Sequence, residues 1–371
     1  MIELKNLTKE FPGLERPAVD ELSLEVKSGE VCVLVGPSGC GKTTTLKMIN
    51  RLHDPDKGEI FLDGEPTSQL DEIELRRGIG YVIQEIGLFP HMTIKENIAT
   101  VPQELGWADE RIDERVKILM EMVGLDPEIY WDRLPAALSG GQRQRVGVAR
   151  ALAADPPVLL MDEPFGAVDP ITRARLQNEF LRIQDQMKKT IVFVTHDINE
   201  AIKMGDRIAV LKEGSLVQYS PPQELLDAPA DDFVAQLVGK NRSIKRLHLI
   251  RVEEIIENEK EKLTVREEAA RGEIKSALQE CAADALCVVD SRGCLRGRLD
   301  ESALEKNSGE IARDLMEEFP DTVTADSTLN DALSVMLECG EGFVPVIDEE
   351  IGEFKDIITL QDLLEEVREG Q

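Results

Sequence analysis

The sequence predicts an α/β protein with a larger N-terminal domain built on a parallel sheet and a smaller α/β domain at the C-terminal end. Apolar strand-like runs alternate with helix-like segments over the first two thirds of the chain, which is typical of a parallel sheet covered by helices. One run, 31–35, leads into a glycine-rich loop and a helix. Two similar segments, 285–290 and 343–348, indicate an internal duplication.

The glycine-rich loop at 36–43 reads Gly-Pro-Ser-Gly-Cys-Gly-Lys-Thr and fits the phosphate-loop pattern G-x-x-x-x-G-K-[ST] at every position. Glycine lets the backbone approach phosphate oxygens closely, and the N–H groups at the start of the next helix face the anion. We expect Lys42 to reach the β- and γ-phosphates of ATP and the Thr43 hydroxyl to bind Mg²⁺. The candidate nucleotide-binding residues here are Gly36, Pro37, Ser38, Gly39, Cys40, Gly41, Lys42, Thr43 and Thr44.

Charge and cysteine content limit the function classes. A net charge of −29 over 371 residues argues against a nucleic-acid partner, because surfaces that bind phosphate backbones need lysine and arginine. The six cysteines show no C-x-x-C spacing, so we expect reduced core residues, with Cys40 as either a reactive thiol or a spacer. No apolar run approaches the ~18 residues that span a bilayer, and the first residues lack an apolar signal core. Any membrane role is therefore expected to come through a partner.

The remaining elements of the first domain follow from hydrophobic periodicity. We expect an edge strand near the N-terminus and a polar helical segment with apolar positions at helical spacing in the middle of the domain. The expected strands are 2–11, 22–26, 58–62, 79–84, 157–161, 190–195, 207–211 and 216–219. The expected helical segments are 43–52, 71–77, 90–124, 138–154 and 231–239.

Several polar or aromatic residues stand where a nucleotide site is expected. Phe11 ends the first expected strand, and the residue alone leaves open whether its ring stacks on adenine or packs in the core. Gln84 ends a strand, and open α/β sheets bind ligands at that carboxyl edge. The run 157–161 delivers Asp162 and Glu163, which are placed for Mg²⁺ and water chemistry unless they only form an acidic turn. His196 follows another strand in the same way.

A second candidate anion site opens the helix at 138–154. Its residues are Ser139, Gly140, Gly141 and Gln142, and many helices begin in this way without binding anything. Further along, basic residues at 242–251 give way to the acidic stretch 253–261. This change of charge predicts a solvated linker at 241–262, ahead of a pseudo-symmetric domain at 263–371.

These motifs, in this order, resemble the ATPase subunit of an ABC transporter over about residues 1–240. The resemblance implies a P-loop NTPase fold with a helical subdomain. The segments 47–52, 80–84 and 88–93 are more narrowly similar to importers of glycine betaine, carnitine and choline, the osmoprotectant class.

The resemblance implies a role for each candidate residue. Phe11 takes the place of the adenine-stacking aromatic, Asp162 would hold Mg²⁺ through water, and Glu163 would be the general base. Gln84 would sense Mg²⁺ and the γ-phosphate and touch the permease, and His196 would contact the γ-phosphate. The implied catalytic residues are Glu163, His196, Gln84 and Lys42, and the implied metal-binding residues are Thr43, Gln84 and Asp162.

The resemblance also implies a two-fold, head-to-tail homodimer. Residues 139–142 of one subunit would close over the ATP that the opposite subunit binds. Asp169 matches the loop in which cassettes contact each other, although Val168 stands where Leu is usual.

The last third of the chain resembles a pair of CBS motifs, at about 263–304 and 312–368. In the second motif, Thr359 and Asp362 match residues that meet the phosphate and ribose of a regulatory nucleotide, although Asp356 replaces a usual Gly. The first motif is degenerate, because Asp300 and Ala303 stand at the matching positions and Asp300 would repel a phosphate. Nucleotide sensing, a response to ionic strength and simple dimerisation all stay open.

We therefore expect an ATP-hydrolysing importer subunit for quaternary-amine osmoprotectants, at the cytoplasmic face of the membrane. Its expected partners are a second copy of the chain, a membrane permease and a substrate-binding protein, and its cofactors are ATP and Mg²⁺. An importer of another small solute such as an amino acid, and a soluble ABC ATPase without transport, are the alternatives.

Overall fold

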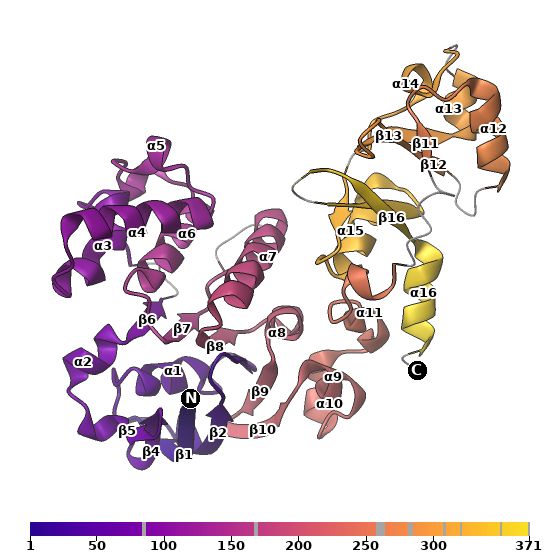
Figure 1. The fold of residues 1–371 in the computed structure, drawn as a ribbon. Coiled ribbons are helices and arrows are strands. Elements are labelled where there is room, and N and C mark those ends of the chain that lie inside the picture. Colours follow the sequence, from indigo (N-terminus) through magenta and orange to yellow (C-terminus); the bar gives the residue numbers. More distant parts are fainter. Residues whose placement is uncertain are drawn as a thin grey trace. The chain divides into compact units, whose positions relative to one another are not determined.

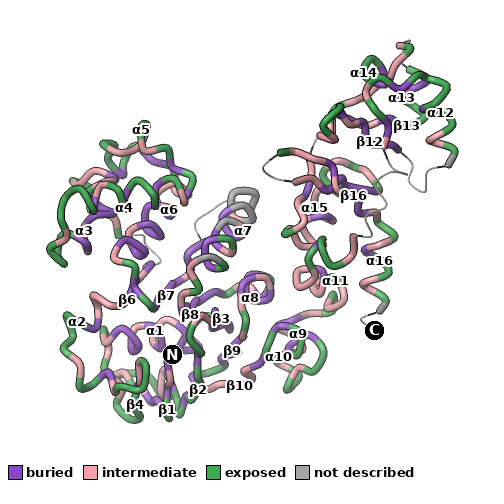
Figure 2. The backbone as a smooth tube through the Cα atoms, in the orientation of Figure 1, coloured by how far each residue is buried: buried purple, intermediate pink, exposed green. Residues whose placement is uncertain are grey.

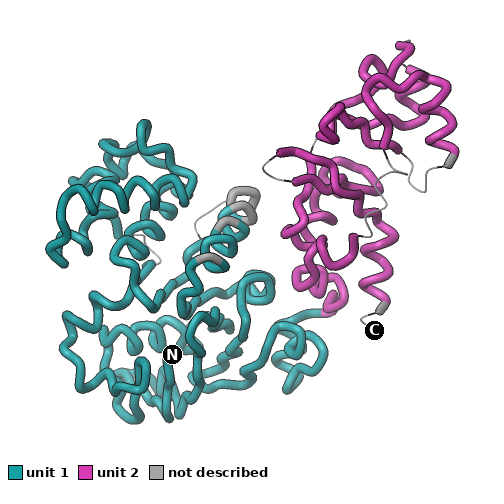
Figure 3. The backbone as a smooth tube through the Cα atoms, in the orientation of Figure 1, with its two compact units in different colours: residues 1–239 teal, residues 240–371 magenta. Residues whose placement is uncertain are grey.

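The computed structural model confirms the predicted α/β class and divides the chain into two compact units, Met1–Gly239 and Lys240–Gln371 (Figures 1 and 3). We describe each unit by itself. The structure describes residues 1–83, 87–166, 170–256, 264–280, 285–306, 309–319, 321–348 and 351–369. None of the helices within these ranges is long and apolar enough to cross a membrane.

The central layer of the first unit is a mostly parallel sheet, in which every interior strand is buried (Figure 2). Over the described residues its strand order is β10-β9-β3-β8-β7-β6. These strands are β3 (Val31–Val35), β6 (Ile79–Val82), β7 (Val158–Asp162), β8 (Thr190–Thr195), β9 (Arg207–Lys212) and β10 (Ser215–Ser220). Since β3, β8 and β7 are parallel neighbours, their carboxyl ends lie together at one edge.

A second, antiparallel sheet has the order β2-β1-β4-β5 in the described part of the chain. Its strands are β1 (Ile2–Lys9), β2 (Val19–Val26), β4 (Lys57–Leu62) and β5 (Glu65–Pro66). The expectation of an N-terminal edge strand is wrong, because β1 pairs with β2 on one side and with β4 on the other. Alternation along one strand gives its buried face but not its number of neighbours.

The hydrophobic core of the first unit joins the two sheets through α1 (Lys42–Ile49). Leu4 and Leu24 of the antiparallel sheet, Leu34 and Leu160 of the parallel sheet, and Leu46 of α1 belong to one cluster of buried side chains. The helix that begins at the phosphate loop is thus anchored in the main core.

The other helices of the first unit flank the sheets or form a separate helical subdomain (Figure 1). The subdomain contains α3 (Ile94–Glu104), α4 (Asp109–Met122), α5 (Pro127–Tyr130), η2 (Pro135–Ala137) and α6 (Gly140–Leu152). The expected helical segment 90–124 is therefore two helices. The flanking elements are η1 (Thr67–Gln69), α2 (Glu72–Arg77), α7 (Pro170–Met187), α8 (Ile198–Met204), α9 (Pro222–Asp227) and α10 (Asp232–Val238).

The second unit consists of two halves with the same strand arrangement. In each half a short strand pairs in parallel with a central strand, and the central strand pairs antiparallel with a third. Both antiparallel pairs carry an irregularity at the same place, Val288/Val289 and Val346/Ile347. The duplication read from the sequence is therefore present in the backbone.

The first half contains β11 (Thr264–Arg266), α12 (Arg271–Glu280), β12 (Ala285–Val289), β13 (Leu295–Asp300), α13 (Glu301–Lys306) and α14 (Ala312–Leu315). The second half contains β14 (Val323–Thr324), α15 (Leu329–Cys339), β15 (Phe343–Ile347), β16 (Phe354–Thr359) and α16 (Leu360–Glu369). Cys287 of β12 packs with Phe343, Phe354 and Ile357 in a buried cluster that joins the halves.

The segment expected to be a solvated linker has a different structure in its described part, residues 241–256. It forms α11 (Arg242–Arg246) and η3 (Val252–Glu254). Leu247 and Val252 are buried in the core of the second half. The charge pattern dominated our expectation, while these few apolar residues determine the packing.

Candidate functional site

The phosphate loop closes around the ammonium group of Lys42. Lys42 Nζ donates to the carbonyl oxygens of Gly36 at 2.6 Å and Pro37 at 3.0 Å, and the side chain is buried. Cys40 is also buried, with its Sγ 3.7 Å from Lys42 Nζ. The loop therefore surrounds a fixed positive charge, which suits a phosphate group.

Two glycines of the loop are required by the neighbouring backbone. Gly41 has φ +102°, and a Cβ there would lie 2.3 Å from the carbonyl oxygen of Ala18. A Cβ on Gly36 would lie 2.2 Å from the carbonyl oxygen of Leu211. Within the described structure, no side chain caps the first turn of α1. The N–H groups of that turn are thus left for an anion.

Thr43 and Asp162 bring two oxygen donors together beside the loop. Thr43 Oγ1 donates to Asp162 Oδ1 at 3.0 Å, across α1 and the end of β7. Hydroxyl and carboxylate oxygens are the ligands that Mg²⁺ prefers, so this pair fits the ion. Burial raises the pKa of the Asp162 carboxyl above its ordinary value, although the Thr43 hydroxyl acts against this. A cation at this position would offset the unfavourable free energy of burying the ionised carboxylate.

Glu163 and His196 meet at the ends of the adjacent strands β7 and β8. The Glu163 N–H donates to Val194 O at 2.9 Å, and Glu163 Oε1 lies 3.2 Å from His196 Nδ1. Glu163 has φ +47°, a left-handed conformation that is rare outside glycine and is found at functional sites. The His196 side chain is 63% exposed. A carboxylate and an accessible imidazole therefore face the same solvent at the edge of the sheet.

Phe11 lies two residues beyond β1 and is half-buried. Its ring contacts His53 edge-to-face at a centroid distance of 5.4 Å, and Lys9 Nζ lies 5.6 Å from the ring centroid. The ring is thus not part of the main core cluster. Gln84 and Asp169 lie outside the described residues.

The second candidate anion site, at the start of α6, is capped by its own residues. Ser139 Oγ accepts the Gln142 N–H at 3.2 Å, and Gln142 Oε1 accepts the Ser139 N–H at 2.9 Å. Gln142 Nε2 also donates to the hydroxyl of Tyr130 at 2.9 Å. Ser139 remains exposed on the surface. The start of α6 is therefore rigidly held and open to a neighbouring molecule.

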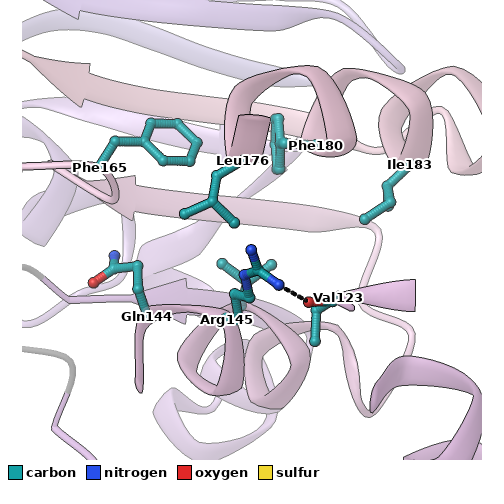
Figure 4. Close-up of a pocket in the computed structure, with 8 residues that line it drawn as sticks. Val123, Gln144, Arg145, Phe165, Leu176, Phe180 and Ile183 are labelled. Atoms are coloured by element: carbon teal, nitrogen blue, oxygen red, sulfur yellow. Dashed lines mark hydrogen bonds between the residues drawn. The ribbon is translucent and has the colours of Figure 1, made fainter. Parts of the chain in front are cut away.

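A small apolar cavity of about 30 Å³ lies between α6 on one side and Phe165 and α7 on the other. Figure 4 shows the residues that line it. Phe165 and Phe180 lie on one side, and Gln144 and Arg145 of α6 lie on the other. Arg145 Nη1 donates to Val123 O at 3.2 Å. Helix α6 thus meets Phe165 and α7 through an incompletely filled contact.

A groove of about 360 Å³ lies beside α2, β6, α3 and α6. The residues that line it include Arg76, Arg77, Phe89 and Arg150. Burial lowers the pKa of Arg150, which donates to Gly87 O at 2.7 Å. Ile83 and Gly87 also line this groove.

Sequence reasoning missed two sets of contacts. Tyr130 was not singled out, because a tyrosine in a short helix gives no sign of its partner Gln142. Thr195 donates a hydrogen bond to Glu200 beside His196. This pair was also missed, because neither residue type indicates its partner. These contacts join separate elements, and only Glu200 offered a hint, as an acidic residue in the first turn of α8.

In the second unit, Thr359 and Asp362 bond to each other at the start of α16. The Thr359 N–H donates to Asp362 Oδ2 at 2.7 Å, and Thr359 Oγ1 accepts the Asp362 N–H at 3.3 Å. At the matching helix start in the first half, Asp300 Oδ1 accepts the Ala303 N–H at 2.6 Å. Both pairs act as helix caps.

Comparisons with known proteins agree with this geometry. Residues 19–166 match the family model for an ABC transporter, and residues 312–369 match the model for a CBS domain. The osmoprotectant import ATP-binding protein OsmV of Salmonella typhimurium is 48% identical over 353 residues, which are 94% of this chain and 92% of that protein. The glycine betaine/carnitine/choline transport ATP-binding protein OpuCA of Bacillus subtilis is 45% identical over 368 residues, 98% of this chain and 96% of that protein.

Among solved structures, the dimeric ATP-binding cassette MJ0796 in a post-hydrolysis state with ADP and Pi is similar with a TM-score of 0.55 and 37% identity. The match covers 60% of this chain and 99% of the cassette. The phosphate loop and the carboxylate–histidine pair at the sheet edge thus define an ATPase of the ATP-binding cassette class.

The chain belongs to the family of ABC transporter ATP-binding subunits that includes OsmV and OpuCA, with a CBS domain at its C-terminal end. The resemblance stated from the sequence is confirmed, and the enzyme is an ATPase coupled to transport.

Proposed function

We propose that this chain powers the uptake of quaternary-amine osmoprotectants, with glycine betaine, carnitine and choline as the candidate solutes. ATP hydrolysis is supported by one observation, the group of polar side chains at one edge of the parallel sheet. These are Lys42, Thr43, Asp162, Glu163 and His196. The solute class is supported by the names of relatives that match nearly the whole chain.

In the proposed mechanism the phosphate loop binds the phosphates of ATP, and Lys42 exchanges its loop carbonyl contacts for β- and γ-phosphate oxygens. The loop residues that line the phosphates are Gly36, Pro37, Ser38, Gly39, Cys40, Gly41 and Thr44. Phe11 stacks on adenine. Thr43, Gln84 and Asp162 hold Mg²⁺, which when bound neutralises charge on the phosphate oxygens.

Hydrolysis depends on the pair at the strand ends. Glu163 accepts a proton from the attacking water, and the distance of 3.2 Å between its Oε1 and His196 Nδ1 lets the imidazole hold the carboxylate in place. The exposed His196 ring contacts the γ-phosphate. Glu163 has an unusual positive φ, and its carboxylate lies beside this ring.

Two copies of the chain work together in this proposal. Ser139, Gly140, Gly141 and Gln142 of one copy close over the ATP bound by the other, and hydrolysis of the ATP resets the dimer to its open state. The exposed, self-capped start of α6 supports this role. Two solved structures of the cassette MJ0796, which is similar in fold to this chain, are dimeric.

The groove lined by Arg76, Arg77 and Arg150 is the proposed docking site for a cytoplasmic segment of the permease. It flanks the segment of Gln84, so that docking and the nucleotide site are adjacent in the chain. A substrate-binding protein outside the membrane would deliver the solute to the permease, and this chain would work at the cytoplasmic face.

For the second unit we propose a regulatory role. The ATPase domain is followed in the chain by a CBS pair, whose first motif is degenerate at Asp300. Thr359 and Asp362 are the candidate residues for a regulatory nucleotide, because their side chains stand at a helix start with hydroxyl and carboxylate groups. Dimerisation of the unit is the competing role.

The test is uptake of radiolabelled glycine betaine, carnitine and choline at high osmolarity, in cells with the permease and with either this chain or its Glu163→Gln variant. Uptake that needs the intact chain supports the proposal and ranks the solutes. Absence of uptake for all three would withdraw the solute class, and amino acids would be tested next. Failure to co-purify with a membrane protein would favour an ATPase without transport.

A further inference from the structure

A buried carboxylate, Glu200, lies behind the turn that carries His196. Glu200 is in the first turn of α8 and is 7% exposed. Its Oε2 accepts a hydrogen bond from Thr195 Oγ1 at 2.6 Å, and its Oε1 accepts one from Gln177 Nε2 at 3.2 Å. The Nε of Arg173 lies 3.9 Å from the same Oε1. None of these residues takes part in the mechanism proposed above.

The Thr195 hydroxyl connects this carboxylate to the backbone around His196. A hydroxyl has one hydrogen to donate and lone pairs that accept. The hydrogen of Thr195 goes to Glu200, and Thr195 Oγ1 accepts the Asp197 N–H at 3.0 Å. The side chain of Thr195 thus spans His196 and holds the residue that follows it. Its backbone is already fixed, because Thr195 pairs with Val35 at the end of β3.

His196 needs such support, since its side chain is 63% exposed and little packing orients it. Its position depends on the backbone turn between Thr195 and Asp197. Asp197 continues the fixed segment, because its side chain accepts the Asn199 N–H at 2.8 Å and so caps α8. The turn is therefore held at both ends, and Glu200 sets the hydroxyl orientation at the first of them.

Only a carboxylate satisfies all of its neighbours at this position. Thr195 and Gln177 each donate a hydrogen bond to one of the two oxygens of Glu200, and the positive Arg173 guanidinium lies within ion-pair distance of Oε1, which an ionised carboxylate suits. A glutamine would have the same shape but would turn an N–H₂ group toward one of these donors. Such a donor–donor contact in a buried place disrupts the network.

We propose that Glu200 is a positioning residue for hydrolysis, which orients His196 through the Thr195 hydroxyl and ties this turn to α7. Gln177 and Arg173 both belong to α7, the helix that follows the segment of Asp169. A displacement of α7 would therefore reach His196 through Glu200. This inference rests on the role proposed for His196.

The experiment measures ATP turnover and KM of the full-length protein for Glu200→Gln, Thr195→Val and Thr195→Ser. A misplaced catalytic group can cost up to ~10²-fold, and for Glu200→Gln and Thr195→Val we expect ~10-fold losses of kcat with KM for ATP within about twofold of wild type. Thr195→Ser keeps the hydroxyl and is expected to keep most of the turnover.

The double variant Thr195→Val/Glu200→Gln separates positioning from simple packing. If both residues act through the same hydrogen bond, the double variant loses no more kcat than either single variant. Losses that multiply would overturn the proposal. A lower melting temperature with unchanged kcat for Glu200→Gln would also overturn it, because that is the effect of a purely structural residue.

Two further results keep the inference separate from the function on which it rests. If Glu200→Gln does not fold, the pair Thr195→Val and Thr195→Ser still decides, and equal turnover of the two would reject the role of the hydroxyl. If His196→Ala hydrolyses ATP at the wild-type rate, the proposed role of His196 fails first. If His196→Ala is inactive and Glu200→Gln is fully active, only the positioning role fails.

Discussion

Two helix starts in the first unit both fit an anion by sequence, but they are built in opposite ways. At the start of α1, Gly41 provides no side-chain cap, and the loop brings Lys42 to its own carbonyl groups. At the start of α6, Ser139 and Gln142 cap each other. The start of α1 therefore carries the positive charge of Lys42, whereas the start of α6 presents a preformed surface of uncharged residues. This difference supports the proposal that one start serves the ATP of its own subunit and the other the ATP of a neighbour.

The largest expected effect is on the α1 side, at Glu163. Glu163→Gln keeps the shape of the side chain but cannot accept a proton from water. We expect ATP to bind as before and turnover to fall ~10²–10⁴-fold, as for loss of a general base. Single-turnover hydrolysis measured beside nucleotide binding checks this. Turnover within a few-fold of wild type would remove Glu163 from its proposed role.

Lys42→Ala should weaken nucleotide binding at the same helix start. Charge-assisted hydrogen bonds are worth about 1.5–3 kcal/mol, so we expect ~10–100-fold weaker binding of ATP, measured by fluorescence or calorimetry. Lys47→Ala is the matched control, because Lys47 lies in the last turn of the same helix and makes none of the loop contacts. Equal losses in the two variants would show that general positive charge, and not the loop, binds the nucleotide.

Ser139 allows the α6 side of the comparison to be tested directly. Ser139→Ala loses the helix cap, which costs about 0.5–2 kcal/mol, and loses the hydroxyl that would face the partner's ATP. Ser139→Asp keeps a good cap but places a negative charge there. If the surface serves a neighbour's phosphates, both variants bind ATP and both have at least ~5-fold lower turnover, with Asp the worse. Rescue of turnover by Asp would mean that only the cap matters.

The sequence predicted more of the site at the start of α1 than at the start of α6. The motif from Gly36 to Thr43 predicted the loop, and strand ends predicted the meeting of Asp162, Glu163 and His196, because parallel strands end at one edge. The cap of α6 involves Tyr130 from another helix, and the support of His196 involves Glu200 and Gln177. Such contacts join side chains from separate elements, and periodicity contains no information about them.

Asp162, beside the start of α1, is expected to make the stability of the protein depend on pH. Burial raises the pKa of this carboxyl in the folded protein, so the folded state binds its proton more tightly than the unfolded chain does. The resulting stabilisation is present at low pH and is lost as pH rises through the folded pKa. Without nucleotide or metal, Asp162→Asn should therefore melt at a higher temperature than wild type at neutral pH. The difference should shrink in acid, and thermal melts of both proteins from neutral to acidic pH check it.

The smallest effect is expected at a third helix start, that of α16, where Thr359 and Asp362 cap each other as Ser139 and Gln142 do. Thr359→Val should lower the free energy of unfolding of the second unit by about 0.5–2 kcal/mol, and Asp300→Ala should do the same in the first half. Melts with adenine nucleotides or cyclic dinucleotides then separate a cap from a binding site. A nucleotide that raises the melting temperature of wild type but not of Thr359→Val would assign it to this site. An equal rise of the melting temperature in wild type and Thr359→Val would mean that the nucleotide binds elsewhere in the protein.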